Sequence, residues 1–317
     1  MTDQKPAAPL NAPLARPPAV PPPLAQPLGA GNERAAIGLM VLVCAIFAAQ
    51  DALSRHLGGA YPPVFVVMLR YWFLAVFCTV MVMRQPGGLR RAIRSKRPVL
   101  QVVRGLLLVA EIILMVEAFV RLGLVNTHAV FTVYPLLVVA LSGPILGEKV
   151  GWRRWTAVAV GFCGILIVLR PGSGVFSADA LLPLGAAFMF AVYGLLTRLV
   201  ARDDPAPVSF FWTGISGAIA VTAIGVWHMQ PLAPRDWVWM ACLCLAATVA
   251  HFLLIRAYEM AEASVIQPFA YTQLVFVSVI GVAVFGDYLA PNVVIGGLIA
   301  VGAGMFTLFR VRAKAQG

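Results

Sequence analysis

The chain has 317 residues, of which 61% are hydrophobic and only 12% charged, and its mean hydropathy is +0.87. Soluble globular domains carry about a quarter charged residues, so this composition excludes an ordinary soluble protein. The formal net charge of +11 could indicate a nucleic-acid surface. The basic residues lie in short loops beside apolar stretches, however, without a folded module to present them, so we expect no nucleic-acid partner.

Residues 1–33 are rich in Pro and Ala and contain no Phe, Trp or Tyr. Because such a segment cannot bury a core, it is predicted to be a disordered cytoplasmic tail. It has no short apolar core followed by a small-residue cleavage site, so no cleaved signal peptide is expected. The stretch PPAVPPPLAQP could bind a partner, and a solvated tail without a specific role is the alternative.

Apolar stretches of about 20 residues span a bilayer as helices, and the remainder of the chain contains ten stretches of this kind. None alternates between polar and apolar residues as the strand of a membrane β-barrel does. The short loops leave no room for a soluble domain. The predicted fold is therefore an all-α integral membrane protein in the lipid bilayer, with ten transmembrane helices near 35–55, 64–83, 99–120, 125–146, 154–169, 181–200, 208–227, 237–258, 265–285 and 292–309.

The distribution of Lys and Arg predicts the orientation. With ten spans and the N-terminus inside, seventeen of these residues fall in cytoplasmic segments and four on the opposite side. Positive charge marks cytoplasmic loops, so both termini are expected in the cytoplasm, with the chain in the inner membrane.

The sequence repeats itself. FAAQDALSR at Phe47–Arg55 returns as FAVYGLLTR at Phe190–Arg198, and the segment from Met115 aligns without a gap on the segment from Leu254. Each copy holds five predicted spans. Because five is odd, the copies must enter the membrane from opposite sides, which predicts two inverted five-helix repeats. This is the architecture of secondary transporters, with the substrate site near the midplane.

These features together resemble the drug/metabolite transporter superfamily, specifically its EamA-type members. The resemblance is carried by Arg70, Tyr134-Pro135, the LGEKVGWRRW turn, the GFCGILIVLRPG segment and the second acidic turn at Gly286-Asp287. It implies repeats at 34–170 and 180–310, a cytoplasmic tail at 311–317, and a cavity lined mainly by spans three, four, eight and nine. It also implies a small metabolite as substrate, such as an amino acid or S-adenosylmethionine.

One position departs from the family pattern. Such families often have Pro about a dozen residues before the second acidic turn, where this chain has Leu274. Because Pro268 lies six residues earlier, the break in span nine is expected to be displaced toward it.

Polar residues of spans four and nine are candidates for the cavity wall. Gln267 and Tyr271 lie on one helical face, and the repeat aligns them with His128 and Thr132, beside Pro135. Tyr134 is a further candidate. Matched polar positions in inverted halves suit a substrate site. Hydrogen bonding between packed helices is the alternative interpretation.

Charges inside the spans are expensive and need a partner or a function. Asp51 could pair with Arg70 across two helices or with Arg55 one turn later, as a structural clamp or in contact with substrate or proton. Glu111 lies near the middle of span three, and Arg104 is expected to reach for the cytoplasmic interface. Glu111 is therefore predicted to bind a proton or a substrate amine, with packing as a protonated acid the alternative.

Other residues receive structural interpretations. Glu117 is expected to pair with Arg121, and Glu148 and Asp287 to cap helix ends rather than to act chemically. His251 and Tyr258 share a face of span eight and are further cavity candidates. The five cysteines fit small buried side chains better than a metal site, so no metal or cofactor is expected.

Three function classes stay in view: a secondary transporter of a small polar or zwitterionic metabolite, an integral membrane enzyme, and a structural or regulatory membrane protein. The enzyme interpretation lacks the clustered His or Asp residues that it needs, and the structural one does not require charges within the hydrocarbon. We therefore expect a transporter, by proton coupling or exchange, and no enzyme. Monomer and homodimer both stay open.

Overall fold

The computed structural model describes residues 30–147, 151–169, 178–260, 266 and 269–315. Throughout these residues the regular structure is helical. The α-helices are α1 (Ala30–Ala60), α2 (Pro63–Met83), α3 (Gly88–Ile93), α4 (Pro98–Leu122), α5 (Leu124–Phe131), α6 (Tyr134–Leu146), α7 (Trp152–Leu169), α8 (Leu181–Val200), α9 (Ala206–Gly225), α10 (Asp236–Met260), α12 (Thr272–Phe285) and α13 (Pro291–Ala315). Two short 3₁₀ turns, Ala178–Ala180 and Val226–His228, precede α8 and follow α9.

The long helices are apolar enough to cross a membrane. Six of the described helical segments meet both the length and the hydropathy expected of a span. Four further apolar helices are shorter, at Tyr134–Leu146, Trp155–Val168, Thr272–Phe285 and Pro291–Ala303. The protein is therefore an all-helical, multi-pass membrane protein.

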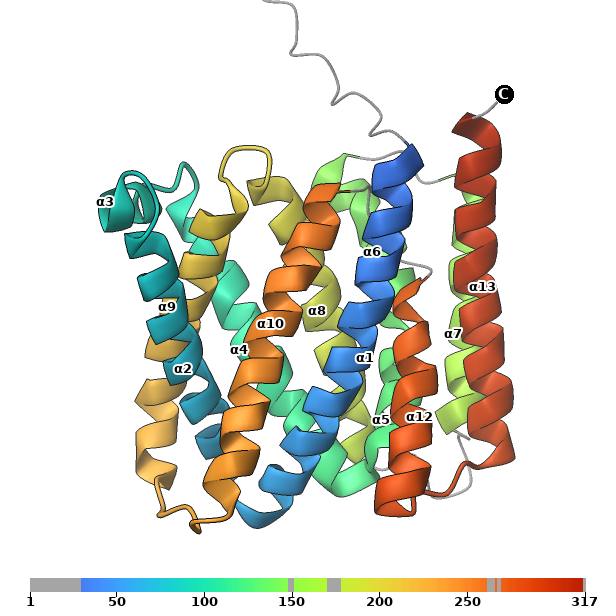
Figure 1. The fold of residues 1–317 in the computed structure, drawn as a ribbon. Coiled ribbons are helices and arrows are strands. Elements are labelled where there is room, and N and C mark those ends of the chain that lie inside the picture. The colour runs from blue at the N-terminus through green and yellow to red at the C-terminus, as the bar shows by residue number, and fades with distance from the viewer. Residues whose placement is uncertain (1–29, 148–150, 170–177, 261–265, 267–268, 316–317) are drawn as a thin grey trace, which may run out of the picture.

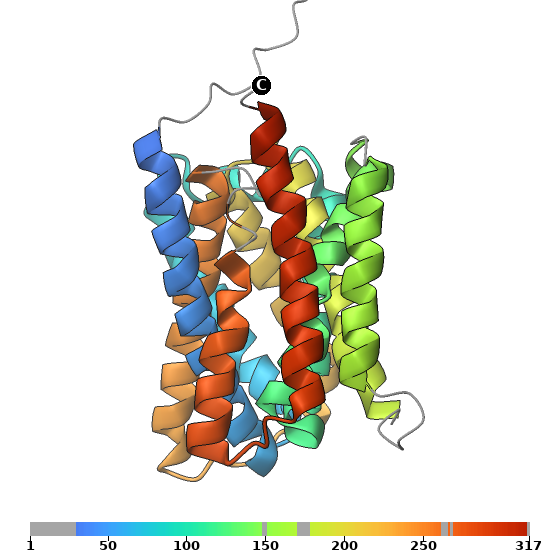
Figure 2. The ribbon, with the colours of Figure 1, turned by 90° about the vertical axis from the view of Figure 1, so that its right-hand side faces the viewer.

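The helices form one upright bundle in which α1 begins and α13 ends at the same end (Figures 1 and 2). Helix α1 packs against α10 and α12, α4 against α8, and α2 against α9. Helices α7 and α13 form a pair at one side (Figure 1). A Cβ atom at Gly164 would lie only 2.7 Å from the carbonyl oxygen of Gly296, so glycine is what lets these two backbones approach.

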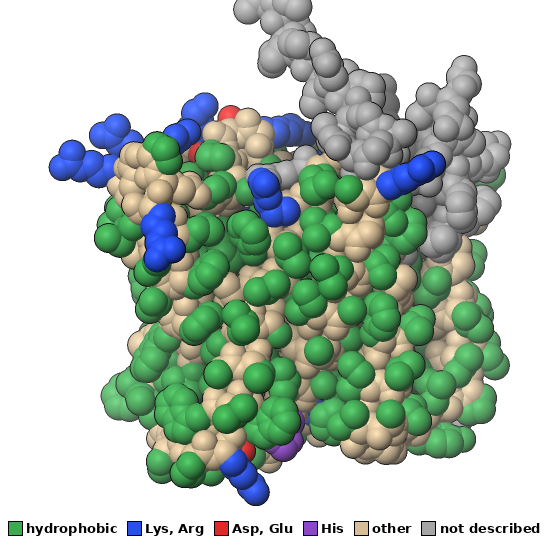
Figure 3. Space-filling view, viewed as in Figure 1, with side chains coloured by type: hydrophobic (Ala, Val, Ile, Leu, Met, Phe, Trp, Pro, Cys, Tyr) green, Lys and Arg blue, Asp and Glu red, His purple; other side chains and the backbone are tan. Residues whose placement is uncertain are grey.

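The outer surface has the polarity of a protein embedded in lipid. Hydrophobic side chains cover most of the height of the face seen in Figure 3, whereas Lys and Arg gather at the end where α3 lies. Large apolar side chains of the described residues are widely exposed, among them Val76 at 65%, Ile219 at 68% and Leu298 at 66%. Such exposure is stable in hydrocarbon and would be a liability in water.

Candidate functional site

Span four is broken in the middle of the bundle. Helix α5 ends at Phe131, and α6 begins at Tyr134 with Pro135 in its first turn. Because Pro has no N–H, it favours the start of a new helix over the continuation of the old one. The Thr132 hydroxyl donates to the His128 carbonyl at 2.6 Å, and the same oxygen accepts the Thr132 backbone N–H at 2.9 Å, so Thr132 closes the last turn of α5.

Span nine restarts at the matching position. Helix α12 begins at Thr272, directly after Tyr271, and Tyr271 is the residue that aligns with Thr132. The start of α12 is therefore in register with the first break and lies four residues beyond Pro268, which itself falls outside the described residues. Discontinuous helices at corresponding positions of two repeats are typical of transporter binding sites.

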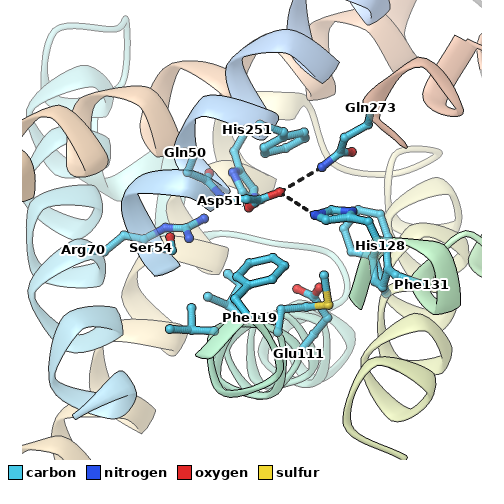
Figure 4. A pocket seen from close by; sticks show the side chains of 15 residues that line it. Gln50, Asp51, Ser54, Arg70, Glu111, Phe119, His128, Phe131, His251 and Gln273 are labelled. Carbon is cyan, nitrogen blue, oxygen red and sulfur yellow. Dashed lines mark hydrogen bonds and ion pairs between the residues drawn. The ribbon is translucent and has the colours of Figure 1, made fainter. Parts of the chain in front are cut away.

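A pocket lies beside these breaks (Figure 4). It is enclosed by α1, α2, α4, α5, α8, α10 and α12, and its floor and walls combine charged, polar and aromatic side chains. The lining residues are Phe47, Gln50, Asp51, Ser54, Arg70, Glu111, Ile112, Met115, Val116, Phe119, His128, Phe131, Phe190, His251 and Gln273.

Asp51 is the centre of a polar cluster in this pocket. Its Oδ2 accepts hydrogen bonds from His128 Nε2 and from Gln273 Nε2, both at 3.0 Å, and its Oδ1 accepts one from Gln50 Nε2 at 2.9 Å (Figure 4). These donors come from α5, α12 and α1. The carboxyl therefore fastens both broken spans to α1.

The expected partners of Asp51 were wrong. Arg55 forms its ion pair with Asp287, at 2.7 Å, rather than with Asp51. Arg70 lines the same pocket as Asp51, but no ion pair joins the two among the residues that the structure describes. His128 takes the place that the sequence assigned to an arginine.

Arg70 and Glu111 are both buried, with 4% and 5% of their surface exposed, and both face the pocket. In the described part of the chain neither side chain has a hydrogen bond or ion pair to a protein group. A buried charge without a partner is costly, so such groups mark a site that receives a ligand or a proton.

The pocket also has an aromatic wall. The Phe119 ring stacks on His128 with a centroid distance of 5.4 Å, and Phe131 contacts both His128 and Phe190. On the other side, the His251 ring meets the edge of Phe47, and its Nδ1–H donates to the Ala247 carbonyl at 3.0 Å. With Nδ1 as donor, Nε2 of neutral His251 is left as an acceptor.

The prediction for Arg104 was wrong. Its side chain is fully buried instead of reaching the interface, and it donates to Thr197 Oγ1, the Ser209 carbonyl and Thr213 Oγ1 at 3.1, 2.5 and 2.6 Å. A planar guanidinium suits three acceptors on neighbouring helices, which explains why it stays inside. The local ion pair of Glu117 and Arg121 is confirmed, at 2.5 Å.

The remaining cavity candidates lie beside the pocket or outside the described residues. Thr132, Tyr134 and Tyr271 are buried but do not line the pocket, and the Tyr134 ring packs edge-to-face with Phe190 at a centroid distance of 5.1 Å. Gln267 and the Tyr258 side chain fall outside the described residues.

Asp287 caps a helix, as expected, but a distant one. Its Oδ2 accepts from the backbone N–H groups of Leu124 and Val125 at 2.9 and 3.3 Å, at the start of α5, rather than from the helix that follows it. Glu148, the matching acid of the first half, falls outside the described residues.

Sequence reasoning missed part of the lining. The four phenylalanines of the lining, Phe47, Phe119, Phe131 and Phe190, have the composition of ordinary membrane helices and were not singled out. Gln273 was not predicted because it lies off the helical face that carries Tyr271. A signal for two of them was present: Phe47 and Phe190 open the two copies of the repeated motif. The resemblance pointed to spans three, four, eight and nine, which correspond to α4, α5 with α6, α10, and α12. The pocket is lined in addition by residues of α1, α2 and α8.

The chain is similar to several transporters. It is 22% identical over 274 residues to an S-adenosylmethionine uptake transporter of Rickettsia bellii, covering 86% of this chain and 93% of that one. It is 26% identical over 278 residues to a riboflavin transporter of Brucella anthropi, covering 85% and 96%. One solved crystal structure has the same fold, with a TM-score of 0.59, 17% identity, and coverage of 89% of this chain and 98% of that one.

A family model matches nearly the whole helical part of the chain, in two consecutive copies. The model is that of the EamA-like transporter family, and the copies cover residues 34–170 and 177–309. The relatives named above are transporters of small metabolites, and the chain follows them over most of their length. The chain belongs to the EamA-like transporter family of the drug/metabolite transporter superfamily.

Proposed function

We propose that this protein is a secondary active transporter that moves a small polar or zwitterionic metabolite, such as an amino acid or an S-adenosylmethionine-like compound, across the inner membrane by alternating access. The observation that carries the proposal is the pair of buried, oppositely charged side chains, Arg70 and Glu111, that face one pocket without a partner among the described residues. A zwitterion supplies the missing partner to each.

The helix packing supports two inverted halves. In the repeat, α1 corresponds to α8, α4 to α10, and α6 to α12. Exchanging the halves therefore turns the α1–α10 contact into the α4–α8 contact, and the α1–α12 contact into the α6–α8 contact. The α2–α9 and α7–α13 contacts each join a helix to its own counterpart. Such a pattern is expected of a pseudo-twofold axis, and it agrees with the start of α1 and the end of α13 lying at one end of the bundle (Figure 1).

In this proposal both ends face the cytoplasm and the pocket is open to one side at a time. Asp51, His128 and Gln273 bind α1 to the two broken spans, so their contacts would be made or broken as the halves move. Glu111 would exchange a proton or a substrate amine during the cycle. Transport would then be driven by a proton gradient or by a second substrate molecule.

The proposal is tested by purifying the protein, reconstituting it into vesicles and measuring uptake of labelled amino acids, nucleosides and S-adenosylmethionine. We expect uptake of one class down an imposed gradient, reduced in Glu111→Gln. Glu117→Gln is the matched control, because Glu117 lies on the same helix but pairs with Arg121 at the surface. Chemical turnover without movement would instead favour a membrane enzyme, and the proposal would be abandoned.

A further inference from the structure

Among the described lining residues of the pocket, the charges all come from one half of the chain. Asp51, Arg70 and Glu111 belong to the first half, whereas the second half contributes Phe190, His251 and Gln273, which are neutral or aromatic. Two carboxyls therefore stand against one guanidinium. When all three are ionised, the empty pocket has an excess of negative charge.

Two neighbouring arginines in the described part of the chain do not offset this excess. Arg55 is bound to Asp287, and Arg104 donates to neutral oxygens away from the pocket. The donors to Asp51 are amides and an imidazole, which orient the carboxylate but supply no charge while His128 is neutral. His251 has its Nδ1–H on a carbonyl, so in its neutral form it presents only an acceptor to a ligand.

A ligand must complement this arrangement, because uncompensated charge is poorly tolerated away from water. A carboxylate can form the paired hydrogen bonds that the Arg70 guanidinium offers. This contact uses the only permanent cation among the described lining residues, so Asp51 and Glu111 then need one positive centre each. A simple zwitterion provides one of the two.

The aromatic wall widens the range of cationic groups that can serve as the second positive centre of the ligand. Phe47, Phe119, Phe131 and Phe190 all line the pocket, and Phe190 is partly exposed. A cation without N–H groups, such as a sulfonium, gains little from hydrogen-bond acceptors but is attracted to ring faces. The wall therefore suits an ammonium, a sulfonium, or a planar group attached to either.

We propose that the pocket selects substrates with a net positive charge, in which one carboxylate binds Arg70 and two cationic centres lie near Asp51 and Glu111. This inference rests on the proposed transport function and narrows its substrate class. The pocket is expected to bind a cationic amino acid or a sulfonium compound more tightly than a neutral zwitterion. An uncharged ring system such as a flavin is expected to bind more weakly than either class.

The test uses matched ligand pairs and thermal melting of the detergent-purified protein at pH 8, where imidazoles are ordinarily neutral. S-adenosylmethionine and S-adenosylhomocysteine differ by one methyl group and one positive charge, and lysine and norleucine differ by the terminal ammonium. We expect at least one cationic member to raise the melting temperature, with an apparent affinity about tenfold or more above that of its neutral mate. Riboflavin is expected to have no effect.

Variants assign the preference to the carboxyls. Asp51→Asn and Glu111→Gln each remove one negative charge, so the preference within a pair should fall to about twofold or less. Glu117→Gln should keep it, because this acid lies outside the pocket. Equal affinity for both members of each pair, a response to riboflavin alone, or no response to the cationic members would overturn the inference.

The vesicle assay separates this inference from the proposed function. If a neutral metabolite is transported and the cationic ligands neither bind nor compete, the substrate class is wrong while the transporter proposal stands. If no metabolite crosses the vesicle membrane but cationic ligands bind, the pocket chemistry is right and the transport function is wrong.

Discussion

Asp287 joins three parts of the bundle at the end of α12, and its removal should be the most informative structural perturbation. Its carboxylate binds Arg55 Nη1 of α1 at 2.7 and 2.8 Å and accepts two backbone N–H groups at the start of α5. The Arg55 guanidinium also lies over the Phe285 ring, 4.3 Å from its centroid. The side chains are only 19% and 12% exposed, so the small energies typical of surface ion pairs do not apply.

We expect Asp287→Ala to lower the free energy of unfolding by about 2–4 kcal/mol. Charge-assisted hydrogen bonds contribute about 1.5–3 kcal/mol each, and water at this end of the bundle would replace part of what is lost. Asp287→Asn keeps an oxygen for the α5 amides but loses the charge for Arg55, so about 1–2 kcal/mol is expected.

The assay is unfolding of the detergent-solubilised protein by SDS, followed by circular dichroism. Glu117→Ala is the control, because its pair with Arg121 is exposed and should leave stability unchanged within error. A double-mutant cycle with Arg55→Ala should give a coupling of about 1 kcal/mol or more. A loss in Asp287→Ala no larger than in Glu117→Ala, or strictly additive effects in the cycle, would refute the reasoning.

Three further predictions use the same assay. Gly123→Ala should lower the free energy of unfolding by about 1–3 kcal/mol, because Gly123 has a φ of +81° and a new Cβ would lie 3.0 Å from Asp287 Oδ1. Gly38→Ala is the control, because nothing lies near its Cβ position and its free energy of unfolding should not change. Arg104→Lys should cost about 2 kcal/mol, because an ammonium cannot reach the three acceptors of the guanidinium; an equally stable variant would contradict this. Burial alone would raise the pKa of Asp204, but hydrogen bonds from Ser95, the Lys96 backbone and Gln101 lower it below its usual range. The stability that Asp204 contributes should therefore be present above about pH 4 and lost as the pH falls through the lowered pKa, so that wild type and Asp204→Asn converge in acid; a constant difference would show that the charge is not involved.

The helical framework could be predicted because lipid imposes a simple rule on sequence. A stretch that is apolar on every face has few alternatives to a membrane helix, so the long helices were found within a few residues. The break at Thr132 was also foreseeable, from Pro135 in an apolar run. The restart of α12 at Thr272 was not, because this chain has Leu274 rather than Pro at the place where the family pattern predicts the break.

Side-chain partners were harder to predict than spans. Asp51 and His128 are 77 residues apart, and their contact depends on how α1 and α5 are rotated about their axes. Sequence spacing reports only which residues share a face or a similar depth, so it offered Arg55, four residues from Asp51, and Arg70 on the next span as partners. The same limit explains the error for Arg104, whose acceptors lie on α8 and α9. Glu117 and Arg121 were predicted correctly because their contact is local.

The repeat shapes the pocket, and divergence between the copies supplies its charge. Phe47 and Phe190 are counterparts in the repeat, as are Ile112 and His251, and all four line the pocket. The acids have no such counterparts, because Asp51 aligns with Gly194 and Glu111 with Ala250. A ligand held by ionic contacts would therefore stay bound to the first half while the uncharged wall of the second half moves past it. Because that wall offers no fixed charge to be separated from the ligand, its movement avoids the large electrostatic cost of breaking ion pairs within the membrane.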